Sequence, residues 1–173
     1  MANAAIARMR STPQAQPLLA PNWFLGLVPR QYWNVKKQFF IYAQEFLPIN
    51  ANATATGNVQ VQNDSHFLCV GGTALVTDTL NTTIINSPSN ANASAKLLSI
   101  TDVAAGFPVS QIAVPLESLF GTAMLPALWP IPKLFRKGTT IATQIQNVAG
   151  ANHNVRLAYW GIRIYPSIPA EVS

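Results

Sequence analysis

Charged residues are scarce in this chain. Only 10% of its 173 residues are Asp, Glu, Lys or Arg, whereas ordinary soluble domains carry roughly 25%. A chain so poor in charge either associates with a membrane or covers much of its surface with partner molecules. No run reaches the roughly 18 apolar residues of a membrane-spanning helix, and the most apolar segment, 116–132, is broken by Pro126 and Pro130. The sequence therefore favours a surface covered by partners, and no membrane.

Cysteine is nearly absent, since Cys69 is the single one. One cysteine excludes a disulfide framework within the chain and is compatible with a reducing compartment. The alternating apolar context of Cys69 predicts a small buried side chain rather than a nucleophile. The basic residues near the start are not followed by an apolar stretch, so we expect no secretory signal there.

Recognisable catalytic patterns are missing as well. His66 and His153 lack a second ligand at metal spacing. The run Asp64-Ser65-His66 contains the residue types of a hydrolase triad, but triad members come from separate elements of a fold, so this run predicts a turn. The glycine pair at 71–72 lacks the lysine of a phosphate-binding loop. We therefore predict no enzyme activity, no metal site and no cofactor.

Short β-strands are what the sequence does contain. Segments rich in β-branched and aromatic residues alternate with turns of Gly, Asn and Pro, and no segment has the period of an amphipathic helix. The predicted strands are 37–47, a short one at 59–61, 66–77, 82–85, 96–101, 139–146 and 155–164. The pattern predicts an all-β protein, an antiparallel β-sandwich with a jelly-roll-like strand order and an extended N-terminal arm.

The last two predicted strands flank a polar turn at 147–154 and would pair as a hairpin at the centre of the fold. In the second of them the apolar residues change face between Tyr159 and Ile162. A β-bulge at Gly161 would supply the extra residue that this change requires. The glycines at 71–72 mark a second bulge or a tight bend.

A proline-rich stretch, 119–133, precedes that hairpin. Its three prolines exclude a central strand or a long helix, so we expect an ordered loop. Its large apolar residues should be buried against something, and they are Leu125, Leu128, Trp129 and Ile131. The candidate interface residues in and after this stretch are Leu128, Trp129, Phe135, Arg136 and Lys137.

The positive charge is concentrated at one end of the chain. Five basic residues precede the first acid, Glu45, and six basic residues balance six acids from there onward. We therefore divide the chain into a basic arm (1–37), a sandwich domain (38–166) and a short tail (167–173). Disordered segments are usually poor in aromatic residues, so this arm either packs on its own domain or, as we favour, docks on a neighbouring subunit. Its candidate partner-binding residues are Trp23, Phe24, Arg30, Tyr32, Trp33, Lys36 and Lys37.

Two other partners remain open. Basic side chains interleaved with Trp and Tyr can neutralise phosphates while the rings stack on bases, so the arm is also a candidate to contact nucleic acid. A carbohydrate-binding sandwich is a weaker alternative, in which Trp129 or Trp160 would be the platform for a sugar.

The chain resembles the small β-structured proteins of tailed-bacteriophage virions. Three stretches within 38–166 carry the resemblance: FFIYAQEFLPINANATATGNVQVQNDSHFLCV, LWPIPKLFRKGTTI and IQNVAGANHNVRLAYWGIRIYP. The resemblance implies a sandwich that decorates or cements a capsid, or that completes a head–tail junction. Its partners would be the major capsid protein, other virion subunits or copies of itself, and its location the virion, assembled in the host cytoplasm. The basic arm departs from simple decoration and favours a protein threaded into its neighbours. On this view a chain without residues 1–37 should fold but lose its place on particles.

Overall fold

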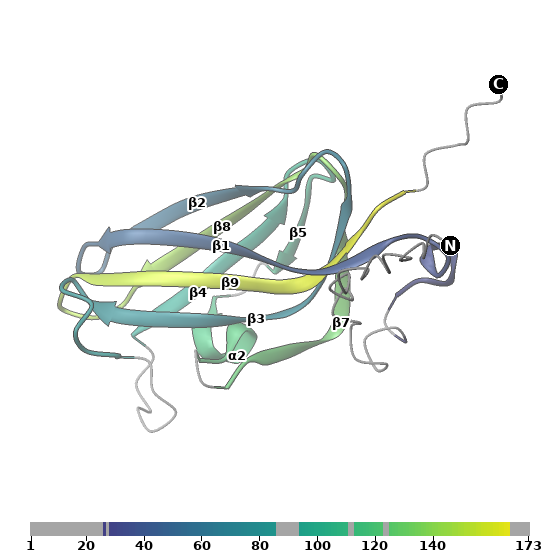
Figure 1. The fold of residues 1–173 in the computed structure, drawn as a ribbon. Coiled ribbons are helices and arrows are strands. Elements are labelled where there is room, and N and C mark those ends of the chain that lie inside the picture. Colours follow the sequence, from purple (N-terminus) through teal and green to yellow (C-terminus); the bar gives the residue numbers. More distant parts are fainter. Residues whose placement is uncertain (1–25, 27, 86–93, 111–112, 123–124, 167–173) are drawn as a thin grey trace, which may run out of the picture.

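Two antiparallel β-sheets packed face to face form the protein (Figure 1). The structure, a computed structural model, describes residues 26, 28–85, 94–110, 113–122 and 125–166. The first sheet has the strand order β1 (Lys37–Ile49), β9 (His153–Ile164), β3 (His66–Asp78) and β7 (Ala127–Phe135). The second has the order β2 (Thr54–Gln60), β8 (Thr140–Asn147), β4 (Ala95–Asp102) and β5 (Phe107–Ser110), and the short β6 (Val114–Pro115) pairs with β4. The predicted all-β sandwich is confirmed.

The longer strands pair from the two ends of the chain inward. β1 pairs with β9, β2 with β8, β3 with β7, and β4 with β5. Further pairing of β3 with β9 and of β4 with β8 joins these pairs into sheets. The predicted hairpin of β8 and β9 is therefore wrong. Both strands exist, but they lie in different sheets, and the polar turn between them crosses from one sheet to the other. Each of the two strands pairs instead with two strands from elsewhere in the chain.

The strand boundaries follow the sequence pattern closely where apolar residues alternate. The strands predicted at 37–47, 66–77 and 96–101 end within two residues of the observed β1, β3 and β4. Residues 54–57, expected in a loop, form the first half of β2 because they pair with β8. The segment 82–85 forms only a single bridge, from Ile84 to Thr77.

The main core lies between the sheets. In β8 every second side chain is buried, so that Ile141, Thr143 and Ile145 face the other sheet. Burying one such aliphatic or aromatic side chain contributes roughly 1.5–3 kcal/mol. The hydroxyl groups of Thr143 and Tyr159 form a hydrogen bond across the core and satisfy each other. The largest fully buried side chains are those of Tyr159, Phe67, Phe120, Phe135, Leu97, Ile100, Leu116, Ile141, Ile145, Leu157, Ile162 and Ile164.

The β-bulge lies in β3 and not in β9. The register of β3 against β9 shifts between Cys69 and Gly71, which makes Val70 the extra residue, while β1 stays in register with β9 past Gly161. The irregularity predicted beside the 71–72 glycines is thus confirmed, and the bulge predicted at Gly161 is wrong. Apolar residues occur on both faces of β9 because the strand is covered on both sides. Tyr159 packs in the main core, and Ile162 and Ile164 belong to a second apolar cluster on the outer face of the sheet.

A second apolar cluster lies on the outer face of the first sheet, away from the main core. It consists of Val28, Leu68, Val70, Ile162 and Ile164, with Tyr32, Val35 and Leu134 packed against it. Val28 and the short helix η1 (Arg30–Tyr32) belong to residues 28–36, which we call the arm root. The arm root therefore packs on the sheet just before β1 begins. Trp23 and Phe24 lie outside the described residues.

The proline-rich stretch also differs from its prediction. A short helix, α2 (Leu116–Phe120), precedes β7, so the segment is not one long loop. β7 is an edge strand of the first sheet. Its pairing with β3 is interrupted between Leu128 and Lys133. Pro130 and Pro132 lie in this interruption at the sheet edge, where their missing N–H groups cost no ladder hydrogen bond. The exclusion of a central strand is confirmed, and the loop assignment is wrong.

Candidate functional site

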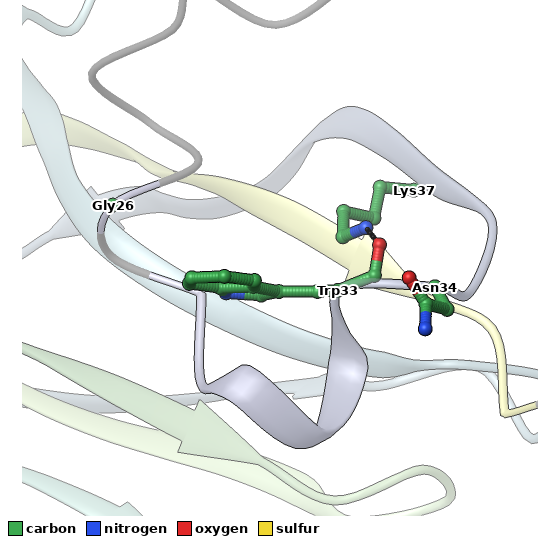
Figure 2. Close-up of a pocket in the computed structure, with 4 residues that line it drawn as sticks. All are labelled: Gly26, Trp33, Asn34 and Lys37. Atoms are coloured by element: carbon green, nitrogen blue, oxygen red, sulfur yellow. Dashed lines mark hydrogen bonds between the residues drawn. The ribbon is translucent and has the colours of Figure 1, made fainter.

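The arm root is held in shape by hydrogen bonds from side chains to its own backbone. The indole Nε1 of Trp33 donates to the carbonyl oxygen of Val28 (2.9 Å), and the ammonium group of Lys37 donates to the carbonyls of Trp33 and Val35. Trp33 nevertheless remains 55% exposed, beside an open cavity of about 510 Å³ that Gly26, Asn34 and Lys37 also line (Figure 2). The fold thus presents an ordered indole ring to solvent.

An apolar row crosses the outer face of the first sheet next to the arm root. Strand register places Ile41 of β1, Trp160 of β9, Gly71 of β3 and Leu128 of β7 side by side. Phe39 lies next to this row, with its ring 6.5 Å from that of Trp160 in an edge-to-face arrangement. Ile41 is 44% exposed and Leu128 is 56% exposed. We call Phe39, Ile41, Leu128 and Trp160 the apolar row.

The edge strand β7 and the residues just before it expose further apolar side chains. Ile131 is 82% exposed and Leu125 is 62% exposed, and Leu128 of the apolar row lies between them in sequence. The single chain does not bury these three, so the expectation that they are buried against something stays a prediction about a partner. Leu128 and Ile131 belong to a strand that has no neighbour on one side, and Leu125 lies just before that strand.

The predicted interface residues divide into two groups. Leu128, Arg136 and Lys137 lie on the surface. Trp129 is buried, and its Nε1 donates to the carbonyl of Leu119 (2.9 Å), while Phe135 is completely buried. Both side chains pack in the main core, so they are core residues and not surface contacts. Trp129 is consequently no platform for a sugar.

One end of the sandwich is strongly basic. The strand register aligns Lys37 of β1, Ile164 of β9 and His66 of β3 at this end, and Arg136 and Lys137 follow the end of β7. We call this region the basic end. Its cations are Arg30, Lys36, Lys37, Arg136, Lys137 and Arg163.

Arg163 is the buried anchor of the basic end. Its Nη2 donates to Asp64 Oδ1 (2.6 Å) and its Nε to Ser65 Oγ (2.8 Å). Its guanidinium carbon lies 4.9 Å from the ring centre of Phe40 and 5.0 Å from that of Tyr165. The hydrogen bond from Arg163 holds the pKa of the Asp64 carboxyl below its usual value. Sequence reasoning missed this group, because a lone Arg among apolar residues of a strand does not reveal a partner 99 positions away.

The described part of the chain holds one buried thiol and no cluster of metal-ligating side chains. Burial raises the pKa of the Cys69 thiol to about 12, so the thiolate that would act as nucleophile is not populated near neutral pH. Within the described residues, no three His, Cys, Asp or Glu side chains gather as a metal site would require. No helix in the same residues is both long enough and apolar enough to cross a bilayer.

Both histidines should make folding stability depend on pH. Burial lowers the pKa of His153, against a smaller opposing effect of Asp78, and burial together with the charges of Lys137 and Arg136 lowers that of His66. Neutral His66 also accepts a hydrogen bond at Nδ1 from the Lys137 backbone (3.2 Å). Because the folded chain then binds fewer protons than the unfolded chain, its stability is complete above the unfolded pKa of about 6.5 and falls as pH decreases below that value.

The measurement is the free energy of urea unfolding at about pH 7.5 and about pH 5. We expect a lower value at the acidic pH for the native chain. His153→Gln should remove part of this difference, and adding His66→Gln should remove most of the remainder. An unchanged pH dependence in the double variant would assign the effect to other groups.

Comparison of the chain with protein-family models, with curated proteins and with solved structures finds no match. Two surfaces of the molecule remain as the basis for a function: the apolar row with the β7 edge, and the basic end.

Proposed function

We propose that the chain is a non-enzymatic structural protein of a virion, which binds and stabilises neighbouring capsid subunits through its sandwich and its N-terminal arm. The observation that carries the proposal is the set of exposed large apolar side chains on the apolar row and the β7 edge. Soluble monomers rarely expose contiguous apolar patches without a function. Centres of protein interfaces are poor in charge and rich in aromatic residues, as this face is.

The β7 edge favours docking by side chains over extension of the sheet. Pro130 and Pro132 have no backbone N–H, so a strand added along this edge would lack ladder hydrogen bonds. Leu128 and Ile131 project from the same edge and are free to enter pockets of a neighbouring subunit. The proposed partner is therefore a folded subunit, either the major capsid protein or another copy of this chain.

The strand order adds support of a more general kind. The proposed jelly-roll strand order is supported by the pairing of the first strand with the last, the second with the next to last, and so on inward. Jelly rolls occur in viral capsid domains and also in lectins and cupins. Since one architecture serves several functions, it supports the proposal only together with the apolar surface. A location in the virion, after assembly in the host cytoplasm, is part of the same proposal.

The test uses particles of the virus that encodes the chain. We expect the chain to be a stoichiometric component of purified particles, and we expect Leu128→Asp with Ile131→Asp to reduce its copy number at least about tenfold. A carboxylate buried in an apolar contact costs several kcal/mol, and repetition over a lattice multiplies the effect on retention. Quantitative mass spectrometry of gradient-purified particles measures the copy number.

Thr56→Asp is the matched control, because Thr56 is exposed on β2 of the other sheet. It should retain the native copy number. Circular dichroism of the purified variants shows whether each is folded. Particles that lack the native chain, or that retain the folded double variant as well as the control, would contradict the proposal.

A further inference from the structure

The basic end differs from the rest of the surface in its balance of charge. Of the nine Lys and Arg among the described residues, six lie at this end, as given above. Two acids, Asp64 and Asp102, lie there with them, which leaves six minus two, a net charge of +4. Asp64 is paired with Arg163, and Asp102 is buried and hydrogen-bonded to Thr139.

Four of these cations are exposed and unneutralised. Arg30, Lys36, Arg136 and Lys137 lie on the surface, and none of them forms an ion pair with any acid that the structure describes. By contrast, Arg156 in the middle of β9 pairs with Glu45 (2.9 Å). A field of unpaired cations attracts a polyanion.

Contacts between side chains show that these cations form one surface. The backbone of Lys137 donates to His66, whose ring centre lies 5.9 Å from that of Tyr32 in the arm root. The ammonium group of Lys36 lies 5.1 Å from the ring centre of Tyr165. The turn after β7, the start of β3 and the arm root therefore border one another.

Aromatic rings lie among the cations. The guanidinium of Arg30 is 5.8 Å from the ring centre of Trp33, and that ring is more than half exposed beside an open cavity (Figure 2). The Trp33 indole is already held by its hydrogen bond to Val28, so little ordering is required before a flat ligand stacks on it. Cations that follow a phosphate backbone, combined with a ring on which bases stack, are the elements of single-stranded nucleic-acid binding.

We infer that the basic end is a binding site for single-stranded nucleic acid, separate from the apolar row that docks subunits. Arg30, Lys36, Arg136 and Lys137 contact phosphates, and Trp33 stacks on a base. An acidic protein would use the cations but would not need the exposed indole, so the nucleic acid fits the whole surface better.

The experiment measures binding of the full-length chain to a labelled single strand of about 20 nucleotides and to the matching duplex, by fluorescence anisotropy. If each of the four cations neutralises one phosphate, the slope of log K against log salt is about −3 for the single strand, which corresponds to about a 50-fold loss between about 50 and 200 mM salt. The single strand should bind more tightly than the duplex.

Two pairs of variants locate the site. Lys137→Glu should weaken single-strand binding about fivefold or more and make the salt slope shallower by about 0.7. Lys96→Glu, an equal charge change on an exposed lysine at the other end of the sandwich, should change the affinity less than about twofold. Trp33→Leu should weaken single-strand binding about fivefold or more with little effect on the duplex. Leu128→Asp should bind as the native chain does.

Several results would overturn the inference. These are no binding by the native chain at low salt, equal losses in Lys137→Glu and Lys96→Glu, or tighter binding to the duplex with no effect of Trp33→Leu. Competition by polyglutamate as effective as that by unlabelled oligonucleotide would assign the basic end to an acidic protein instead.

Discussion

A chain that begins at Lys37 is expected to be much less stable than one that begins at Gly26. Removing the arm root exposes the outer-face cluster, in which Val28 is 3% exposed and Ile162 and Ile164 are completely buried. Burial of one such side chain contributes roughly 1.5–3 kcal/mol, and several lose part of their cover together. We therefore expect a loss of about 3–6 kcal/mol, a large share of the roughly 5–15 kcal/mol typical of a domain.

Urea unfolding followed by circular dichroism measures this difference. The chain 26–173 is the control, because it keeps the arm root and all the described residues of the outer-face cluster. Val28→Asp in the full-length chain repeats the test without truncation, since it places a carboxylate in that cluster. Equal stability of the two truncated chains would show that the arm root does not pack on the first sheet.

This expectation also changes how the docking of the arm should be tested. The sequence alone suggested that residues 1–37 can be removed as a unit. Since residues from Val28 onward cover Leu68 and Val70 of β3, their removal would mix loss of folding with loss of docking. A truncation of residues 1–25 separates the two effects.

Gly161→Ala is expected to destabilise the sandwich by about 2–4 kcal/mol. A Cβ atom at this position would lie 2.2 Å from the carbonyl oxygen of Leu68 and 2.7 Å from the ring of Phe67. Phe67 is fully buried and packs edge-to-face on Tyr42, with ring centres 4.8 Å apart. Neither the backbone of β3 nor this ring can move without disturbing the main core.

Gly150→Ala is the matched control, because nothing lies within 4 Å of a Cβ placed there. Its free energy of unfolding should stay within about 0.5 kcal/mol of the native value. Thermal and urea unfolding of the two variants give the comparison. Equal stability of the two would mean that β3 does not approach β9 at Gly161 as the register requires.

The exposed part of the candidate site was visible in the sequence to a limited degree. Arg136 and Lys137 follow an apolar strand and precede Gly138, a turn pattern that places them on the surface. Trp129 and Phe135 could not be assigned in the same way. Burial along β7 does not alternate, because its pairing with β3 is interrupted between Leu128 and Lys133. Only the structure therefore shows which side chains face the core.

Local sequence determined the class of the fold and the character of its surface. Alternation of apolar residues reports which face of a strand is buried, and prolines report where a strand cannot be central. The sandwich and the exclusion of the proline-rich stretch from the centre of a sheet therefore follow from residues close together in the chain. The scarcity of charge predicts a surface that meets partners, and this stays a prediction.

Only the tertiary structure decided which strands are neighbours. Alternation carries no information about the identity of the adjacent strand, and β1 pairs with β9 across more than a hundred intervening residues. Four features depend on that long-range pairing. They are the placement of β8 and β9 in different sheets, the bulge in β3, the packing of the arm root over Ile162, and the ion pair of Arg163 with Asp64. Burial of apolar side chains on both faces of the first sheet lowers the free energy of the folded chain. This burial brings together segments that are far apart in the sequence, so no single segment predicts it.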